Sequence, residues 1–293
     1  MATGVKWTGA AKESPIEQRR TRVLPVSRAL AAVIVPFLVV AWAILYLLPD
    51  RTGELFAWPI SPPITSMMLG ATYIGGAYFF IRAILARSWE EIALGFLPVT
   101  GFAGLLGVAT ILHWEAFTPG HLSFLVWTTL YLTTPFLVLG VWWANQRQVA
   151  GSASPDQDQV ALSDRARIVA GGLGLVAVTV SLVLFIWPQQ LIDVWPWSLS
   201  PLTARVMAAI FALGGAGIGI ARDPRWRAVR LLVQVVWVML GLFLVAIARA
   251  WAQLDPGNPL TWVIVIWLVA VLALSAILYA RMERRHGLAR SHR

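Results

Sequence analysis

The sequence contains no cysteine among its 293 residues. Disulfide bonds, thiol catalysis, iron–sulfur clusters and cysteine-ligated zinc are therefore excluded. Charged residues are also scarce: they make up 13% of the chain, whereas a soluble globular domain normally carries about 25%. So few charges cannot cover a water-exposed surface, and we expect most of the chain to lie in apolar surroundings.

Signatures of several enzyme classes are missing as well. The sequence has no Walker-type phosphate loop, no Gly-x-Ser-x-Gly nucleophile elbow and no His-Glu-x-x-His zinc motif. No pair of carboxylates lies deep within an apolar run, which argues against a proton pump built on buried acids. His113 and His121 are separated by a Pro-Gly turn instead of facing each other. We therefore expect no haem, metal or other cofactor.

Long apolar runs dominate what is present. The chain is 58% hydrophobic with sixteen Trp residues, and its mean hydropathy is +0.72. A helix needs roughly 20 mostly apolar residues to cross about 30 Å of hydrocarbon. Eight runs meet this length: 29–48, 63–83, 91–112, 122–143, 166–187, 202–220, 228–249 and 260–280. The predicted fold class is an all-α integral membrane protein with eight transmembrane helices, and its expected partner is the lipid bilayer.

The distribution of basic residues predicts the orientation. Of the 23 Lys and Arg residues, all but Arg51, Arg205 and Arg249 fall in the tails or in connections on one side. The positive-inside rule places that side, with both termini, in the cytoplasm. We expect a multi-pass protein of the cell inner (plasma) membrane, from a bacterium because Arg greatly outnumbers Lys. Charge spread over tails and short loops does not favour nucleic-acid binding.

An internal repeat with a period of 137 residues is the second architectural prediction. Trp58-Pro59 corresponds to Trp195-Pro196 in the second half of the chain, and Trp114 corresponds to Trp251. Matches of Trp, Pro and Gly in loops are rarer than matches of Leu and Val, and self-similarity at a fixed period marks repeats. Four spans per unit give two tandem four-helix repeats of the same orientation, related by a pseudo-two-fold axis along the membrane normal.

This scheme divides the chain into five parts. The first span is expected to be retained, because its apolar run is longer than that of a cleaved signal peptide. The expected parts are a disordered basic tail over 1–27, repeat one over 28–148, a flexible linker over 149–164, repeat two over 165–286 and a basic tail over 287–293. The equivalent spans 63–83 and 202–220 are rich in Gly and Ala. We expect them to pack closely against neighbours, since small residues let helices approach in lipid.

The span 122–143 is the most polar. Thr129 and Thr133 precede Pro135, which is expected to kink the helix because proline removes a backbone hydrogen bond. One interpretation is a bent polar helix that faces a cavity. The alternative, which we favour at this stage, is that the threonine hydroxyls bond the carbonyls that the proline leaves free.

A second group of candidates lies at the ends of spans on the outer side. Arg205, Arg249, His113 and Glu115 are expected there, and an ionisable residue within the membrane is a functional-site hypothesis by default. They suggest a ligand-binding crevice with the two arginines as counter-ions. The alternative is that the arginines extend to lipid phosphates, as long cationic side chains do near a boundary.

Three functions remain open on these observations. The favoured one is a non-catalytic accessory or scaffold subunit, which binds a membrane-protein partner or a second copy of the chain. The alternative is a permease-like transporter with an outward-facing crevice for a small or amphipathic ligand, anionic ligands included. The weakest is an outer-leaflet enzyme with His113 and Glu115 as acid and base. A polar cavity reaching the middle of the membrane would favour transport.

Overall fold

The structure is a computed structural model that describes residues 22–149 and 160–291. All its regular secondary structure in these ranges is helical, apart from a single bridge between Ala161 and Arg225. Eight helical stretches are long and apolar enough to cross a membrane, which confirms the predicted number of spans. They are Pro25–Leu47, Pro63–Leu85, Ala93–Leu112, Leu122–Val149, Asp164–Ile186, Pro201–Arg222, Trp226–Arg249 and Pro259–Leu288.

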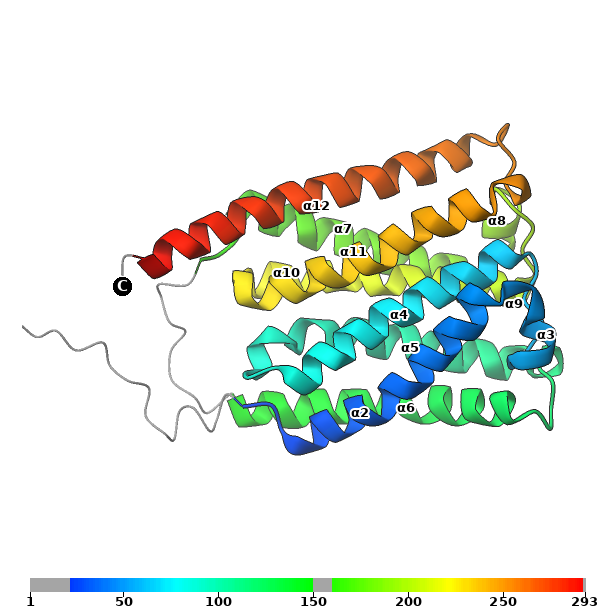
Figure 1. The fold of residues 1–293 in the computed structure, drawn as a ribbon, viewed down its shortest axis with the longest axis horizontal. Helices are drawn as coiled ribbons and strands as arrows, with labels where there is room; N and C mark the ends of the chain where they lie inside the picture. The colour runs from blue at the N-terminus through cyan, green and yellow to red at the C-terminus, as the bar shows by residue number, and fades with distance from the viewer. Residues whose placement is uncertain (1–21, 150–159, 292–293) are drawn as a thin grey trace, which may run out of the picture.

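The helices run roughly side by side along the longest axis of the molecule (Figure 1). In chain order they are α2 (Pro25–Trp42) with η1 (Ala43–Leu47), α4 (Pro63–Leu85), α5 (Ala93–Leu112), α6 (Leu122–Val149), α7 (Asp164–Ile186), α9 (Pro201–Phe211) with η5 (Ala212–Gly215) and α10 (Ala216–Arg222), α11 (Trp226–Arg249), and α12 (Pro259–Ser291). We call the end of the bundle at which α12 finishes the terminal end.

Short helical turns connect the long helices. At the terminal end lies η3 (Trp89–Glu91); on the opposite side, which we call the loop end, lie η2 (Pro49–Arg51), α3 (Thr52–Leu55), η4 (Trp114–Ala116), α8 (Gln189–Ile192) and η6 (Trp251–Gln253). Figure 1 shows α3 and α8 at this loop end, away from the C-terminus.

Proline determines where several long helices begin. The first residues of α2, α4, α9 and α12 are Pro25, Pro63, Pro201 and Pro259. Proline suits the first helical position because its N–H would lack a partner there in any case and its φ is already helical. At α9 the preceding Ser200 adds a capping box with Thr203, which satisfies two further backbone N–H groups.

Two helices depart from regular α geometry. The first span ends in the π-helical turn η1, and the sixth is interrupted by the 3₁₀ turn η5, which contains Gly214 and Gly215. The internal prolines Pro36, Pro98 and Pro135 all lie in the first half of the chain. The first half therefore places prolines inside its helices, and the second half has a glycine-containing 3₁₀ turn.

Some helices extend beyond the apolar runs that predicted them. The first begins at Pro25 instead of residue 29, and α12 continues to Ser291, into the expected tail over 287–293. Most of the expected tail over 1–27 and of the linker over 149–164 lies outside the described residues. The end of that linker is described: Leu162 N donates to Pro224 O at 3.0 Å, and Trp226 N donates to Val160 O at 2.9 Å.

The glycines of the second and sixth spans pack closely against neighbouring helices, as expected. A Cβ atom added to Gly70 of α4 would lie 3.1 Å from the Cβ atoms of Leu45 and Tyr46 at the end of the first span. On the sixth span, a Cβ atom added to Gly214 would lie 2.5 Å from Ala177 of α7. Each of these two glycines therefore faces the first helix of its own half, and neither faces the other.

Candidate functional site

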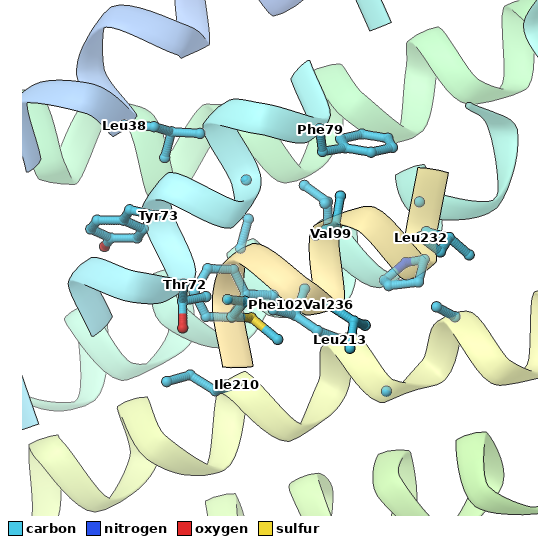
Figure 2. Close-up of a pocket in the computed structure, with 18 of the residues that line it drawn as sticks. Leu38, Thr72, Tyr73, Phe79, Val99, Phe102, Ile210, Leu213, Leu232 and Val236 are labelled. Carbon is cyan, nitrogen blue, oxygen red and sulfur yellow. The ribbon is translucent and has the colours of Figure 1, made fainter. Parts of the chain in front are cut away.

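A partly open cavity of about 370 Å³ lies between the helices of the bundle. All eight spans contribute to its wall. Figure 2 shows part of the lining, with labelled side chains from α2, α4, α5, α9, η5 and α11. One lining residue from each span, in chain order, is Leu38, Phe79, Val99, Leu130, Ala177, Leu213, Val236 and Trp267. A space of this size is within the range of small-molecule sites, about 300–1,000 Å³.

The wall of the cavity is almost entirely apolar. It carries no Asp, Glu, Lys, Arg or His side chain within the described parts of the chain. Its polar side chains are Thr72 and Tyr73 of α4, Tyr131 and Thr134 of α6, and the indole of Trp267. The cavity is therefore suited to an uncharged apolar molecule, because a charge moved into such surroundings without a partner is costly.

Two tyrosines of the wall form its main polar feature. Tyr73 and Tyr131 are buried, and the Tyr131 hydroxyl donates to the Tyr73 hydroxyl at 2.7 Å. Both lie near the middle of their spans. The bond joins α4 to α6 and places two hydroxyl groups deep within the membrane.

The polar span 122–143 divides its hydroxyl groups between two faces. Thr129 and Thr133 are exposed on the outside of the bundle, where the Thr133 hydroxyl donates to Thr129 O at 2.6 Å. Tyr131 and Thr134 line the cavity instead. The polar helix thus does face a cavity, but through neighbours of the two threonines that were singled out from the sequence.

Pro135 is a buried residue of α6. Because proline has no N–H, the carbonyl of Tyr131, four residues earlier, lacks its helical hydrogen bond. That carbonyl lies against Gly107 of α5, where an added Cβ atom would be only 2.5 Å from its oxygen. The Thr133 hydroxyl bonds a different carbonyl, that of Thr129. Close approach of a neighbouring glycine, and not a threonine hydroxyl, therefore covers the carbonyl that the proline frees.

At the loop end, the structure brings Arg205 and His113 together. An Nη atom of Arg205 lies 2.7 Å from His113 Nε2, and Arg205 Nε donates to Phe185 O at 3.1 Å. The guanidinium also lies 5.9 Å from the centre of the Phe185 ring. Partial burial, and then the positive charge of Arg205, lower the pKa of His113 below its ordinary value of 6.5. His113 therefore accepts from Arg205 as a neutral imidazole.

Arg249 occupies a separate but similar position. Its Nη atom donates to Tyr46 O at 2.9 Å, and its guanidinium lies 5.5 Å from the centre of the Tyr46 ring. Tyr46 and Phe185 are in the last turns of the first and fifth spans. Each arginine thus donates to a carbonyl in the last turn of a helix, where the carbonyl groups have no N–H partner within the helix. The negative end of the helix dipole also favours a cation there.

These contacts change how the outer candidates are interpreted. Both guanidinium groups bond helix ends through different neighbours, and within the described chain Arg249 makes no hydrogen bond to Arg205 or His113. Glu115 is exposed in η4, and the described structure shows neither a hydrogen bond nor an ion pair for it. The four residues therefore do not form one charged crevice by direct contact.

Sequence reasoning missed the cavity and the pairing of Tyr73 with Tyr131. A tyrosine in the middle of an apolar span is a usable signal, because its hydroxyl needs a partner when buried. The partner is 58 residues away along the chain, and no local pattern links two such positions.

Comparison with known proteins gives no match: no protein-family model, no curated protein and no solved structure is similar to this chain. The function is therefore argued from the residues themselves.

Proposed function

We propose that this polytopic membrane protein binds an apolar small molecule or lipid chain in the cavity between its helices. It differs from the permease-like alternative in that the ligand is uncharged and lies in an apolar cavity between the helices instead of in an outward-facing crevice. The observation that carries it is one apolar cavity to which all eight spans contribute. Ligand sites in helical bundles typically lie between helices and have mostly apolar walls with a few polar groups.

The size of the cavity supports a binding role. Protein interiors are close-packed, and unfilled space in a core costs about 24 cal/mol per Å³. The cavity of about 370 Å³ is only partly enclosed, so a ligand or lipid chain can enter it, and filling the space would remove such a cost.

Two matched variants of α5 test the proposal. Val99 lines the cavity, whereas Val108 is 46% exposed on the outside of the same helix. The full-length protein in phosphatidylcholine nanodiscs would be irradiated with a long-chain alkane carrying a diazirine, and the labelled peptides mapped. We expect labelling of cavity residues such as Met239, its loss in Val99→Phe and its retention in Val108→Phe. Labelling confined to the outer surface in the wild-type protein would refute the proposal.

An accessory or scaffold role is the second candidate, and the exposure of α12 favours it. In the most apolar window of α12 only 6% of the residues are buried, against 61% for α4. A partner helix or lipid must cover the rest. Mild detergent extraction followed by native mass spectrometry distinguishes the two, because a scaffold retains a protein partner in fixed ratio. The enzyme alternative gains no support, since no described contact joins His113 to Glu115.

We further propose that the chain consists of two tandem four-helix repeats. The support is that corresponding elements recur 137 residues apart: α3 with α8, η4 with η6, and the first residue of α6 with that of α12. Trp89 and Trp226 have the same spacing, and each is 1% exposed. An experimental structure in which residues 28–148 and 165–286 fail to superpose would refute this division.

The orientation is proposed on the distribution of charge, with the terminal end in the cytoplasm of a bacterial cell. The chain has no cysteine, so a single introduced cysteine reports its own position without interference. We expect Arg87→Cys to react with an impermeant maleimide only after the cells are opened, and His121→Cys to react in intact cells. The reverse pattern would overturn the orientation.

A further inference from the structure

The hydroxyl groups of Tyr73 and Tyr131 are arranged so that one proton donor remains available. Tyr131 donates to Tyr73 at 2.7 Å. The oxygen of Tyr73 is thereby an acceptor, and its own hydrogen has no acceptor among the described residues. Buried polar groups in proteins are almost always hydrogen-bonded. Tyr73 is 2% exposed and lines the cavity, so a partner for its hydrogen is expected within the cavity.

The other hydroxyl groups of the wall have different roles. Thr72 donates to Met68 O of its own helix at 3.0 Å, which satisfies its hydrogen. Thr134, three residues after Tyr131, is buried and lines the cavity, and it has no hydrogen bond within the described chain. Tyr73 and Thr134 are therefore two donors in a wall that is otherwise apolar.

Charge and shape restrict the molecule that these donors would bind. An anion is disfavoured because no cationic side chain lines the cavity in the described chain. A pure hydrocarbon would leave the Tyr73 hydrogen without an acceptor, at a cost. Aromatic side chains such as Phe102 and Phe243 also line the wall, and their faces suit a flat or unsaturated group.

We propose that the cavity selects a neutral apolar molecule that carries a carbonyl oxygen, such as a quinone or a long-chain ketone. Tyr73 donates to that oxygen, and Tyr131 stands behind it as second donor. Two hydroxyl groups in series strengthen the terminal bond, because each polarises the next. This inference rests on the proposed function and specifies its ligand class.

The test uses competition against the diazirine alkane in nanodiscs containing the full-length protein. The competitors are a long-chain ketone and an alkane of equal length, at equal fractions of the lipid. One hydrogen bond is worth about 1 kcal/mol, so we expect the ketone to compete about fivefold better. The double variant Tyr73→Phe/Tyr131→Phe, which leaves neither hydroxyl group of the pair free to donate, should abolish most of that preference and leave competition by the alkane unchanged. Tyr78→Phe is the control, because its hydroxyl lies on the same helix but donates to Gln234 at 2.9 Å and is not part of the wall.

The outcomes separate the two proposals. If cavity residues are labelled but the ketone has no advantage, or if the double variant keeps the advantage, the carbonyl selection is wrong and the cavity proposal stands. If no cavity residue is labelled, the proposed function itself fails. Should the double variant not fold, Tyr73→Phe and Tyr131→Phe singly each leave one hydroxyl group with no second donor behind it and should reduce the preference; an unchanged preference in both would contradict the carbonyl selection.

Discussion

The first two helices of each half of the chain pack against each other in different ways. Between α7 and α10 the contact is backbone against backbone: a Cβ atom added to Gly174 would lie 2.7 Å from Ile218 N. Between α2 and α4 the glycine meets a side chain instead, since a Cβ atom added to Gly76 would lie 3.3 Å from Leu38 Cδ1. Similar small-residue patterns thus bring two backbones together at one interface and a backbone against a side chain at the other, and both interfaces border the cavity.

Alanine substitutions at these two glycines should have the largest contrast in stability. Both gain the same helix propensity, at most about 1 kcal/mol, so the difference between them reports the contact. Gly174→Ala forces two backbones apart and should cost about 2 kcal/mol or more, whereas Gly76→Ala meets only the end of a flexible side chain and should be near neutral. Thermal unfolding in detergent measures both. Equal losses would show that the two interfaces are alike.

The last helices of the two halves, α6 and α12, are also held differently. Asn145 of α6 is 1% exposed; its Nδ2 donates to Ser27 Oγ at 2.7 Å, and its Oδ1 accepts from Leu24 N at 3.1 Å. On α12, Glu283 accepts from Trp226 Nε1 at 2.9 Å and pairs with Arg230 at 3.0 Å.

Replacing these two side chains by alanine should lower the free energy of unfolding by different amounts. Asn145→Ala leaves buried polar groups unpaired and should cost about 2 kcal/mol. Glu283→Ala should cost closer to 1 kcal/mol, because it leaves a single buried donor, Trp226 Nε1, unpaired, and the ion pair with Arg230, which is 44% exposed, contributes little. Chemical denaturation of each variant checks the order, and a larger loss for Glu283→Ala would contradict it.

The two arginine contacts at the loop end offer a more balanced comparison. Arg249 bonds the last turn of the first span and Arg205 that of the fifth. Replacement by leucine should destabilise the protein by about 1 kcal/mol in each case. Because neither arginine lines the cavity, cross-linking of the diazirine alkane at Met239 should not change. Loss of labelling in either variant would restore the charged crevice as the binding site.

The smallest expected effect is a pH dependence that only the Arg205 contact should have. The pKa of His113 is lowered in the folded protein, so the unfolded chain binds the proton more readily. The contribution of neutral His113 to the free energy of unfolding should therefore be fully present above pH 6.5. It should decrease as the pH falls below that value towards the lowered pKa. Unfolding midpoints measured against pH should show a shallower decrease in His113→Gln than in the wild type. Identical pH profiles of the two proteins would show that the contact with Arg205 does not lower the pKa of His113.

Eight spans are predictable from composition, because lipid requires long apolar helices with satisfied backbones. Their bounds agree with the predicted runs to within a few residues except at the ends of the fourth and eighth spans, which continue past residues 143 and 280 to Val149 and Leu288. The prolines also mark the starts of several helices without tertiary information, whereas the interruptions at η1 and η5 contain no proline. The contact of Arg205 with His113 and with the end of the fifth span was not foreseeable from the sequence, since it depends on where the carbonyl of Phe185 lies.

The cavity and its tyrosine pair arise only when the chain is folded. Thr133 and Thr134 are adjacent in sequence, yet one faces outward and the other lines the cavity. In lipid both faces of a helix are apolar, so the polar–apolar periodicity that reveals the inner face of a soluble helix is weak. Which residues meet across the bundle is decided by how closely the backbones approach, through contacts as specific as that of Gly107 with the Tyr131 carbonyl.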